Sequence, residues 1–445
     1  MLDLSLRTRW LSLASSLLAV TACASDPADH VGPAPDDPMM EEQPPAPVVL
    51  PHIDGVVVDR AGLPLANKIV VVAGKSVLSD AEGKFTFTDV TAPYEVVLTE
   101  TGSSLVSSVV GLTTATPRIL YTYWPESHDA TIQGALMTPT KQGDHMMLGV
   151  TTPYSAETFD NMYAPNFNNQ YARWWGPETT TASILAIKYT DDGTPKANPV
   201  SFEALGTATV QVEAGKVTSG IALAAHDPIE VMMAGTIAVP ADTEWASVTM
   251  FAAAGGASVE VHRFDGTGAL AAFSGVMPSG VGISAGFTAS AHTPDGEAMR
   301  FVRDIPTDAQ DLVLTVPAPA HIEEPALGTA VTPGDAIRWS DVNHKLFIVD
   351  IAQYDATQNR YPWNWRTLTS GHSVTIPDLA SLGMHWVPGR PVTMWIYAYD
   401  LPMTLDEAAG YSLDTVLDKV WGSDGMTSID GSLAFTRDGV GFTSN

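Results

Sequence analysis

One five-residue run has the letters of a hydrolase nucleophile motif. Gly282-Ile283-Ser284-Ala285-Gly286 fits the pattern G-x-S-x-G, in which a serine on a strained turn between a strand and a helix attacks an acyl carbon. Here the following residues, Phe287 to His292, continue as a strand and end in a Pro-Asp-Gly turn instead of opening a helix. The run therefore predicts a strand, and no catalytic residue is expected in it.

The other groups that could carry chemistry are scattered along the chain. The 11 histidines show none of the close spacings of a zinc site. Asp191-Asp192-Gly193 and Asp227-Pro228 are typical of turns and lack the spaced oxygen ligands of a calcium loop. The local sequence thus predicts no metal site, no cofactor and no enzyme activity, and it leaves open only an active site assembled from distant residues.

Aromatic side chains are the residues best suited to binding. Tyr163, Phe167, Tyr171, Trp174 and Trp175 lie in one asparagine-rich stretch that we interpret as irregular. Rings beside amides can bind sugars or peptides, so Tyr171, Trp174 and Trp175 are the candidate ligand-stacking residues. The alternative is that these rings fill the core of a module.

A second aromatic group lies in the last third of the chain. Its members are Tyr361, Trp363, Trp365, Trp395, Tyr397 and Tyr399. The spacing of two puts the last three on one face of a strand, and we expect that face to point into a sandwich core.

The only cysteine, Cys23, closes the run Leu18-Ala19-Val20-Thr21-Ala22-Cys23, which follows two arginines and a short apolar stretch. That order is typical of a secretory signal, and the stretch is too short to span a bilayer. The run resembles the lipobox of bacterial lipoproteins. The resemblance implies cleavage before Cys23 and a diacylglyceryl group on its sulfur, and Ala24 implies the outer membrane, on a face left open. The alternative is an ordinary signal peptide followed by a free thiol.

The composition limits the classes of partner. The chain has 50 acidic and 22 basic residues and a net charge of −28, so its surface repels nucleic acid and anionic headgroups. No nucleic-acid partner is expected. No run of 18 apolar residues follows the signal, so the N-terminal lipid is the expected contact with the membrane.

Composition also predicts the fold class. Only 16% of the 445 residues are charged, while Gly (36) and Pro (32) are plentiful, which favours strands joined by many turns. The chain length suits about two to four domains. We predict an all-β chain of tandem β-sandwich modules, preceded by a proline-rich, acidic, disordered tether.

The residues from His52 onward alternate with period two between turn signals. Their landmarks are a Gly55 opening, the turns Asp59-x-x-Gly62-x-Pro64-Leu65 and Asp80-x-x-Gly83-x-Phe85, and Pro93-Tyr94. Residues 52–100 resemble the carboxypeptidase regulatory-like domain, a small transthyretin-like β-sandwich without catalytic residues of its own. Each turn glycine is expected to have a positive φ, and each turn aspartate to accept hydrogen bonds from backbone amides.

Two later stretches echo the Gly55 opening, around Gly134 and Gly235. The intervals are 79 and 101 residues, which favours separate modules over a strict repeat. Residues 387–400 resemble the late strand of a fibronectin type III domain, with Trp395 where that family has a tyrosine, and residues 404–420 could form one helix.

The predicted order of domains along the chain is as follows. It consists of a lipoprotein signal peptide (1–22), the tether (23–51), a carboxypeptidase regulatory-like sandwich (52–125), two further sandwiches (126–228 and 229–323), a fibronectin type III-like or immunoglobulin-like module (324–400) and a C-terminal extension of unassigned structure (401–445).

These features favour a non-enzymatic, lipid-anchored cell-envelope protein. Its modules would be structural, adhesive or binding units in contact with an envelope protein or polysaccharide. The alternative is a carbohydrate-binding surface lipoprotein that serves glycan capture or degradation, with Trp174 and Trp175 as stacking residues. An enzyme whose groups meet only in space is the third class.

Overall fold

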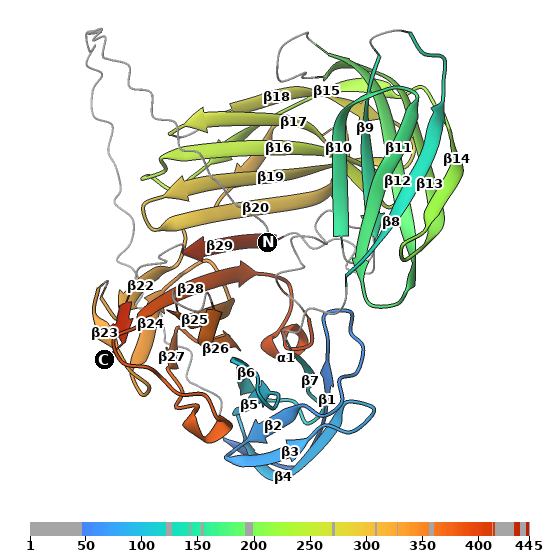
Figure 1. Ribbon diagram of the computed structural model, residues 1–445. Helices are drawn as coiled ribbons and strands as arrows, with labels where there is room; N and C mark the ends of the chain where they lie inside the picture. The colour runs from blue at the N-terminus through green and yellow to red at the C-terminus, as the bar shows by residue number, and fades with distance from the viewer. Residues whose placement is uncertain are drawn as a thin grey trace, which may run out of the picture. The chain divides into compact units, whose positions relative to one another are not determined.

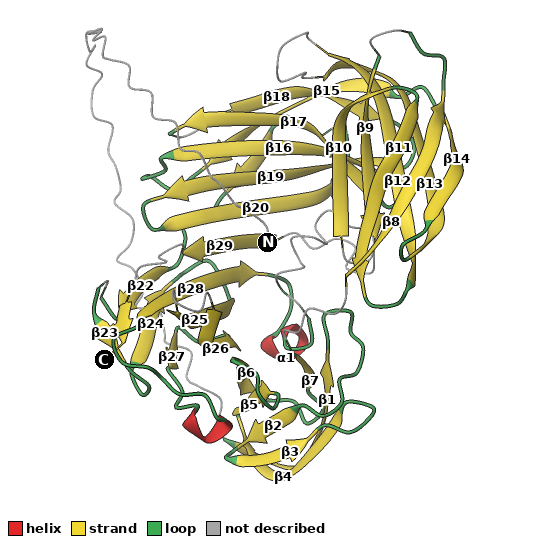
Figure 2. Cartoon of the chain, in the orientation of Figure 1, coloured by secondary structure: helices red, strands yellow, loops and turns green. Residues whose placement is uncertain are grey.

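The computed structural model describes residues 47–121, 127–141, 144–152, 155–191, 199–268, 272–307, 309–326, 328–355, 360–411, 413, 431–436 and 442–444. The predicted signal peptide, Cys23 and nearly all of the predicted tether lie outside these residues. Within them the regular structure is almost entirely β-strand (Figure 2). The predicted all-β fold of tandem modules is confirmed.

The first sandwich contains seven strands. They are β1 (Val48–Val58), β2 (Ile69–Val72), β3 (Lys75–Leu78), β4 (Lys84–Ala92), β5 (Tyr94–Thr99), β6 (Leu105–Leu112) and β7 (Arg118–Leu120). One sheet has the order β4-β1-β7 and the other the order β3-β2-β5-β6. Strand β4 shows why they pack: Phe85, Phe87 and Val90 are buried while the threonines between them are exposed.

The turn residues of this sandwich have the predicted local roles. Gly62 and Gly83 have φ of 76° and 72°. Asp59 Oδ1 accepts from the backbone N–H of Leu63 at 2.8 Å, and Asp80 Oδ1 accepts from that of Lys84 at 2.7 Å. The two turns are therefore closed by side chains, as the motif predicts.

The second and third sandwiches each contain seven more strands. Those of the second are β8 (Ser127–Met137), β9 (His145–Thr152), β10 (Ser155–Tyr163), β11 (Asn166–Trp175), β12 (Thr179–Asp191), β13 (Pro199–Glu213) and β14 (Val217–Ala224). Those of the third are β15 (Ile229–Ala238), β16 (Trp245–Ala254), β17 (Ala257–Thr267), β18 (Ala272–Ser279), β19 (Ile283–Thr293), β20 (Gly296–Ile305) and β21 (Leu312–Thr315).

All three sandwiches share one topology. Their small sheets are β4-β1-β7, β11-β8-β14 and β18-β15-β21, and their larger sheets contain β3-β2-β5-β6, β10-β9-β12-β13 and β17-β16-β19-β20. In every case the first strand pairs antiparallel with the fourth and parallel with the seventh. The chain thus builds the same seven-stranded unit three times, with different loop lengths.

A glycine facing a phenylalanine marks the same place in each unit. The pairs, opposite each other on the first and fourth strands, are Gly55 and Phe85, Gly134 and Phe167, and Gly235 and Phe273. A Cβ on these glycines would lie 2.2, 2.5 and 2.6 Å from the facing ring. The ring therefore occupies the space of the missing side chain, which explains why the three openings resemble one another in sequence.

The fourth sandwich has a different strand order from the first three. Its strands are β22 (His321–Glu324), β23 (Ala330–Val331), β24 (Ala336–Ser340), β25 (Leu346–Asp355), β26 (Arg360–Thr369), β27 (Ser373–Thr375) and β28 (Pro391–Asp400), with the 3-10 helix η1 (Ala380–Leu382) before β28. One sheet has the order β22-β24-β27, and the other continues from β26-β25-β28 to β29 (Gly431–Thr436), while β30 (Phe442–Ser444) pairs with β23 and β28.

The helix predicted over residues 404–420 is short where the structure describes it. Helix α1 spans Leu405–Ala408 and begins with a capping box between Thr404 and Glu407. Residues 414–420 lie outside the described residues.

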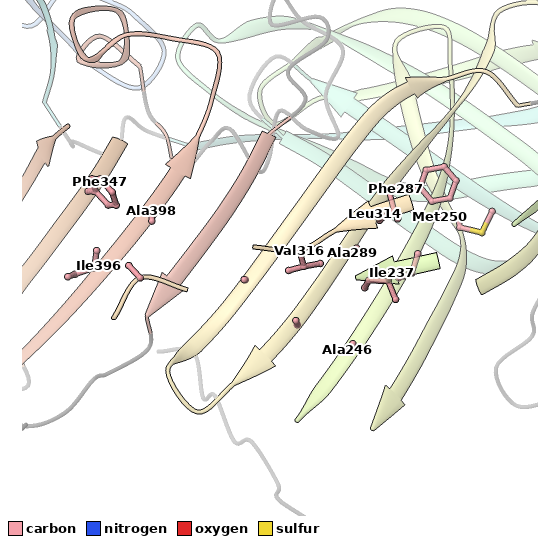
Figure 3. Packing of buried hydrophobic residues seen from close by; sticks show 14 of the residues in the cluster. Ile237, Ala246, Met250, Phe287, Ala289, Leu314, Val316, Phe347, Ile396 and Ala398 are labelled. Carbon is pink, nitrogen blue, oxygen red and sulfur yellow. The ribbon is translucent and has the colours of Figure 1, made fainter. Parts of the chain in front are cut away.

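One sheet connects three of the sandwiches (Figure 1). Its strands follow the order β17-β16-β19-β20-β29-β28-β25-β26-β6-β5-β2-β3. A buried cluster beside it includes residues of the third sandwich, such as Phe287 and Met250, and of the fourth, such as Phe347 and Ile396 (Figure 3). The modules therefore share both backbone pairing and core.

Candidate functional site

The predicted stacking residues lie on a strand, so the irregular stretch expected there is a wrong prediction. Strand β11 carries Tyr171, Trp174 and Trp175. Because successive side chains of a strand point to opposite faces, Trp174 and Trp175 cannot share a face. Trp174 is fully buried, and its Nε1 donates to the carbonyl of Pro177 at 2.7 Å. It is a core residue and offers no ring face to a ligand, which corrects the expectation for this side chain.

Tyr171 and Trp175 lie on the other face of β11. Tyr171 is 40% exposed, and its ring meets the edge of Phe159 at 5.3 Å between centroids. Trp175 is half-buried. The guanidinium of Arg173, between them on the strand, lies 5.5 Å from the Tyr171 ring. This face keeps one open ring, that of Tyr171.

The second aromatic group is divided in the same way. Trp363 and Trp365 are buried. On β28 the core-facing residues are Met394, Ile396 and Ala398, so Trp395 and Tyr397 face the opposite side and are half-buried. The aromatic face of this strand points away from the core of the fourth sandwich. It faces the core of the first sandwich instead, in which Tyr399 is buried and against which Tyr397 packs.

The predicted strand at the serine motif is confirmed. Ser284 is the second residue of β19 and lies opposite Ala253 in the ladder with β16. Its hydroxyl contacts Asp304 at 3.3 Å. In the part of the chain that the structure describes, no group of three or more His, Cys, Asp or Glu side chains is placed to hold a metal ion.

The junction between the first and fourth sandwiches is a parallel ladder. Strand β6 pairs with β26 over six residue pairs, from Leu105 with Asn364 to Val110 with Thr369. This pairing joins segments that are more than 250 residues apart in the chain. Parallel strands of this kind are buried on both faces, and β25 beside them is buried at eight of its ten positions.

A chain of buried hydrogen bonds crosses this ladder. Trp365 Nε1 donates to Ser108 Oγ at 3.0 Å, and Ser108 Oγ donates to Thr367 Oγ1 at 2.8 Å. All three side chains are at most 3% exposed. If the two strands paired in another register, these polar groups would stay buried without their partners, so the two sandwiches are specified to meet in this register.

The segment around α1 reinforces the same junction. Asp406 accepts from the backbone N–H of Thr113 at 3.0 Å and from its hydroxyl at 2.6 Å. The N–H of Leu120 donates to the carbonyl of Ala409 at 2.7 Å. Leu405 and Ala408 are part of the apolar cluster of the first sandwich. Residues after β28 thus cover the first sandwich as well as the fourth.

Strand β29 joins the third and fourth sandwiches. It pairs antiparallel with β20 from Gly431 to Phe435 and antiparallel with β28 from Ser432 to Thr436. It lies between these two strands (Figure 1). Strand β29 is therefore a neighbour of both the third and the fourth sandwich, and the predicted C-terminal extension belongs in part to the fold.

The second and third sandwiches meet at a close approach of their backbones. A Cβ on Gly149 of β9 would lie 2.0 Å from the carbonyl oxygen of Ser258 on β17. The N–H of Phe202 also donates to Glu230 Oε1 at 2.6 Å. Only glycine allows β9 to lie this close to the next module.

A buried lysine in the second sandwich is paired with two carboxylates. Lys188 Nζ lies 2.7 Å from both Asp144 Oδ2 and Glu203 Oε2 and donates to the carbonyl of Pro139 at 2.8 Å. Burial lowers the pKa of Lys188, but its hydrogen bonds to Asp144 and Glu203 outweigh this effect and raise the pKa. A protonated amine is not a nucleophile, so this cluster is a structural ion pair.

A second buried pair lies in the fourth sandwich. The side chains of Asp341 and His344 are both fully buried, with Nδ1 2.7 Å from Oδ2. Burial raises the pKa of Asp341, but the hydrogen bond and charge of His344 outweigh it, and the pKa is lowered. The pair closes the turn between β24 and β25.

A large groove lies at the junction of the first and fourth sandwiches. This groove has a volume of about 1030 Å³. Its walls are Ile69 of β2, Ser76 of β3, the β5–β6 turn, the start of β26 and the η1 segment. A smaller cavity of about 420 Å³ lies between the second and third sandwiches, next to the fully exposed Val281.

Comparison with known proteins assigns no family. No protein-family model matches the chain, and no curated protein is detectably similar to it. None of the helices that the structure describes has the length and apolar character needed to cross a membrane.

Solved structures show distant likenesses. A leucine-rich repeat protein from Bacteroides thetaiotaomicron is 12% identical with a TM-score of 0.18, and the match covers 42% of this chain and 26% of that one. The Bacillus anthracis TIE protein is 11% identical with a TM-score of 0.15, and the match covers 60% and 50%. The fimbrial anchor protein Mfa2 from Porphyromonas gingivalis is 13% identical with a TM-score of 0.15, and the match covers 44% and 92%.

The chain spans about a quarter to a half of the length of the first two of these proteins. With TM-scores this far below 0.5, the likenesses assign neither an activity nor a partner. The chain is a multi-sheet β protein with a distant structural similarity to bacterial fimbrial and surface proteins, and no domain family is identified for it.

Proposed function

We propose that this chain is a non-enzymatic, lipid-anchored protein of the bacterial cell envelope whose coupled β-sandwiches serve a structural or adhesive role. The observation that carries the proposal is the sharing of strands between modules. Parallel pairing of β6 with β26 and the double pairing of β29 join three sandwiches into one sheet. A load applied to one module is passed to the next through backbone hydrogen bonds in such a sheet.

The finer assignments are part of this proposal. The first sandwich is taken as a carboxypeptidase regulatory-like domain, which the two aspartate-closed turns support. The fourth is taken as fibronectin type III-like, which is supported by its sheets β22-β24-β27 and β26-β25-β28-β29. The boundaries predicted from the sequence remain proposals.

The attachment is proposed to be a lipid on Cys23, at the outer membrane. The lipobox resemblance supports it, and two or more acyl chains anchor a protein stably where one does not. Intact-mass spectrometry of the mature protein should give Cys23 as the first residue with the mass of its acyl groups added. Cys23→Ser should abolish both the added mass and membrane retention. An unmodified thiol, or a different first residue, would refute the anchor.

The adhesive or structural role is tested separately. Coupling predicts that single-molecule extension of the chain gives one high-force event for the first and fourth sandwiches together. Disrupting the ladder with Ser108→Asp should split this event into two of lower force. Independent unfolding of the two sandwiches in the unmodified protein would contradict the proposal.

A further inference from the structure

We propose that the groove at the junction of the first and fourth sandwiches binds a neutral oligosaccharide. The groove is lined by β2, β3 and the β5–β6 turn of the first sandwich on one side and by β26 and the η1 segment on the other. This inference names the class of partner for the adhesive role proposed above, and in that respect rests on it.

The groove has the size for such a ligand. Its volume is about 1030 Å³, at the upper end of the roughly 300–1,000 Å³ usual for ligand pockets. An elongated chain of several sugar rings fits a volume of this kind better than one small molecule does.

The lining of the groove is polar but uncharged. The described residues that line it include five serine and threonine side chains, one tyrosine and one asparagine amide, and none of them carries a charge, although the whole chain has a net charge of −28. A surface without charge in so acidic a protein suits a ligand that is itself neutral and rich in hydroxyl groups. An anionic polysaccharide would be repelled by the surrounding carboxylates.

Five polar side chains of the lining are available for hydrogen bonding, while Ser103 Oγ already accepts from the backbone N–H of Leu105. Ser76, Thr101, Ser104 and Ser381 are exposed, and Asn364 is half-buried. Among the residues that the structure describes, none of these five side chains makes a hydrogen bond. A bound sugar could therefore replace water at each of them without breaking a bond in the protein.

Tyr361 provides the ring face. It is 45% exposed at the start of β26 and lines the groove together with Asn364, and Tyr354 packs against it at 5.3 Å between centroids. The apolar face of a pyranose ring can stack on an aromatic ring held in this way. Trp363 and Trp365 continue on the same strand but are buried, so Tyr361 is the exposed member of that aromatic row.

The floor of the groove belongs to both sandwiches. The N–H of Asn364 donates to the carbonyl of Ser104 at 2.9 Å, where the β6–β26 ladder begins. The groove therefore exists only while the two modules are paired. A ligand bound there makes contacts on both sides and should stabilise the junction.

The experiment is binding of the purified full-length protein, in a detergent without a sugar headgroup, to an array of oligosaccharides, followed by calorimetric titration of the hits. Neutral oligosaccharides of four or more units should bind, and oligogalacturonates should not. Tyr361→Ala should weaken binding at least tenfold, and Asn364→Asp, which is isosteric but removes the amide donors, should also weaken it. Tyr411→Ala is the matched control, because Tyr411 is 44% exposed and lies outside the groove.

The outcomes separate this inference from the proposed function. No binding to any neutral oligosaccharide, or binding that survives Tyr361→Ala unchanged, overturns the groove as a glycan site. Loss of binding in Tyr171→Ala instead would move the site to β11. Neither result affects the tests of the lipid anchor or of mechanical coupling, which fail or succeed without sugar.

Discussion

The glycine that faces a phenylalanine in each repeated sandwich gives the sharpest test of the architecture. In Gly134→Ala the new Cβ would lie 2.3 Å from the carbonyl oxygen of Ile221 and 2.5 Å from the Phe167 ring. Contacts under 3.0 Å are essentially absent from real structures, so β8 or β14 must move by about 0.7 Å. Phe167 is fully buried and has no free space to move into.

The energetic cost follows from this crowding. Overpacking a close-packed core costs about 1–3 kcal/mol, occasionally more, and the involvement of a backbone carbonyl places Gly134→Ala at the upper end, at about 3 kcal/mol. With a urea dependence of about 1–3 kcal/mol per molar, the midpoint for this module should fall by about 1–3 M. Gly235→Ala should have a similar cost, because its new Cβ would lie 2.6 Å from the Leu312 carbonyl oxygen. Gly55→Ala should cost less, because the three atoms nearest to its new Cβ all belong to the Phe85 ring and none to the backbone.

The assay is urea unfolding read by hydrogen exchange mass spectrometry, which reports each sandwich separately. Gly286→Ala, in strand β19, is the control. Its new Cβ would lie at an ordinary contact distance of 3.5 Å from the carbonyl oxygen of Val302 on β20, so it should leave the midpoint nearly unchanged. If Gly134→Ala and Gly286→Ala shift their modules equally, the packing explanation for the repeated glycine is refuted.

Three further predictions concern the junctions and the buried charges. Ser108→Ala leaves the Trp365 indole N–H and the Thr367 hydroxyl without their hydrogen-bond partner, so the first and fourth sandwiches should lose about 2–4 kcal/mol in chemical denaturation, while exposed Ser76→Ala should not matter; equal effects would contradict the buried chain of hydrogen bonds. Gly149→Ala forces β9 away from Ser258, so hydrogen exchange in β9 and β17 should rise, and unchanged protection would show that the two modules do not meet there. The lowered pKa of Asp341 means that its pairing with His344 stabilises the protein above the usual aspartate pKa, and that this stability is lost as the pH falls through the lower folded value. Acid titration of the melting temperature should therefore be flatter below pH 4 for Asp341→Asn than for the unmodified protein, and superimposable curves would contradict the account.

Much of the fold class can be predicted from the sequence, because turns and strands depend on residues that are close together in the chain. The turns at Asp59 and Asp80 are closed by their own side chains, and strand periodicity makes the Gly282–Gly286 run a strand. The echo of Gly55 at Gly134 and Gly235 was also visible, but its cause was not. Each glycine faces a phenylalanine some 30 to 40 residues further on, a pairing that is fixed by sheet register and not by local pattern.

The candidate residues were harder to predict. Trp174 and Trp175 are neighbours in sequence, and once the stretch was interpreted as irregular, nothing showed that they lie on opposite faces of β11. The alternation of the small or apolar Ala172 and Trp174 with the more polar Tyr171 and Arg173 is typical of a strand with one buried face, and it was the signal in the sequence that could have shown this. Trp395 and Tyr397 lie on a strand that contributes to an apolar cluster on each of its faces. The usual rule that a strand has one apolar face, which points into its own sandwich, therefore fails there.

The junctions were not predictable from single segments. The pairing of β6 with β26 joins parts of the chain separated by more than 250 residues, and the only local sign was two adjacent serines, Ser107 and Ser108, inside an otherwise apolar run. The groove around Tyr361 depends on that junction, so no motif could have marked it.

The parallel register of β6 and β26 is the claim that a single measurement tests most directly. Ser108 and Thr367 are paired in the ladder, with their hydroxyl oxygens 2.8 Å apart, a separation that cysteine sulfurs can close to about 2.05 Å in a disulfide. Ser108→Cys/Thr367→Cys, made with Cys23→Ser so that no other thiol competes, should form an internal disulfide under mild oxidation, seen as a faster band on a non-reducing gel. Ser108→Cys/Arg366→Cys, one residue out of register, should stay reduced. Equal cross-linking of both pairs, or of neither, would contradict the account of the joined modules.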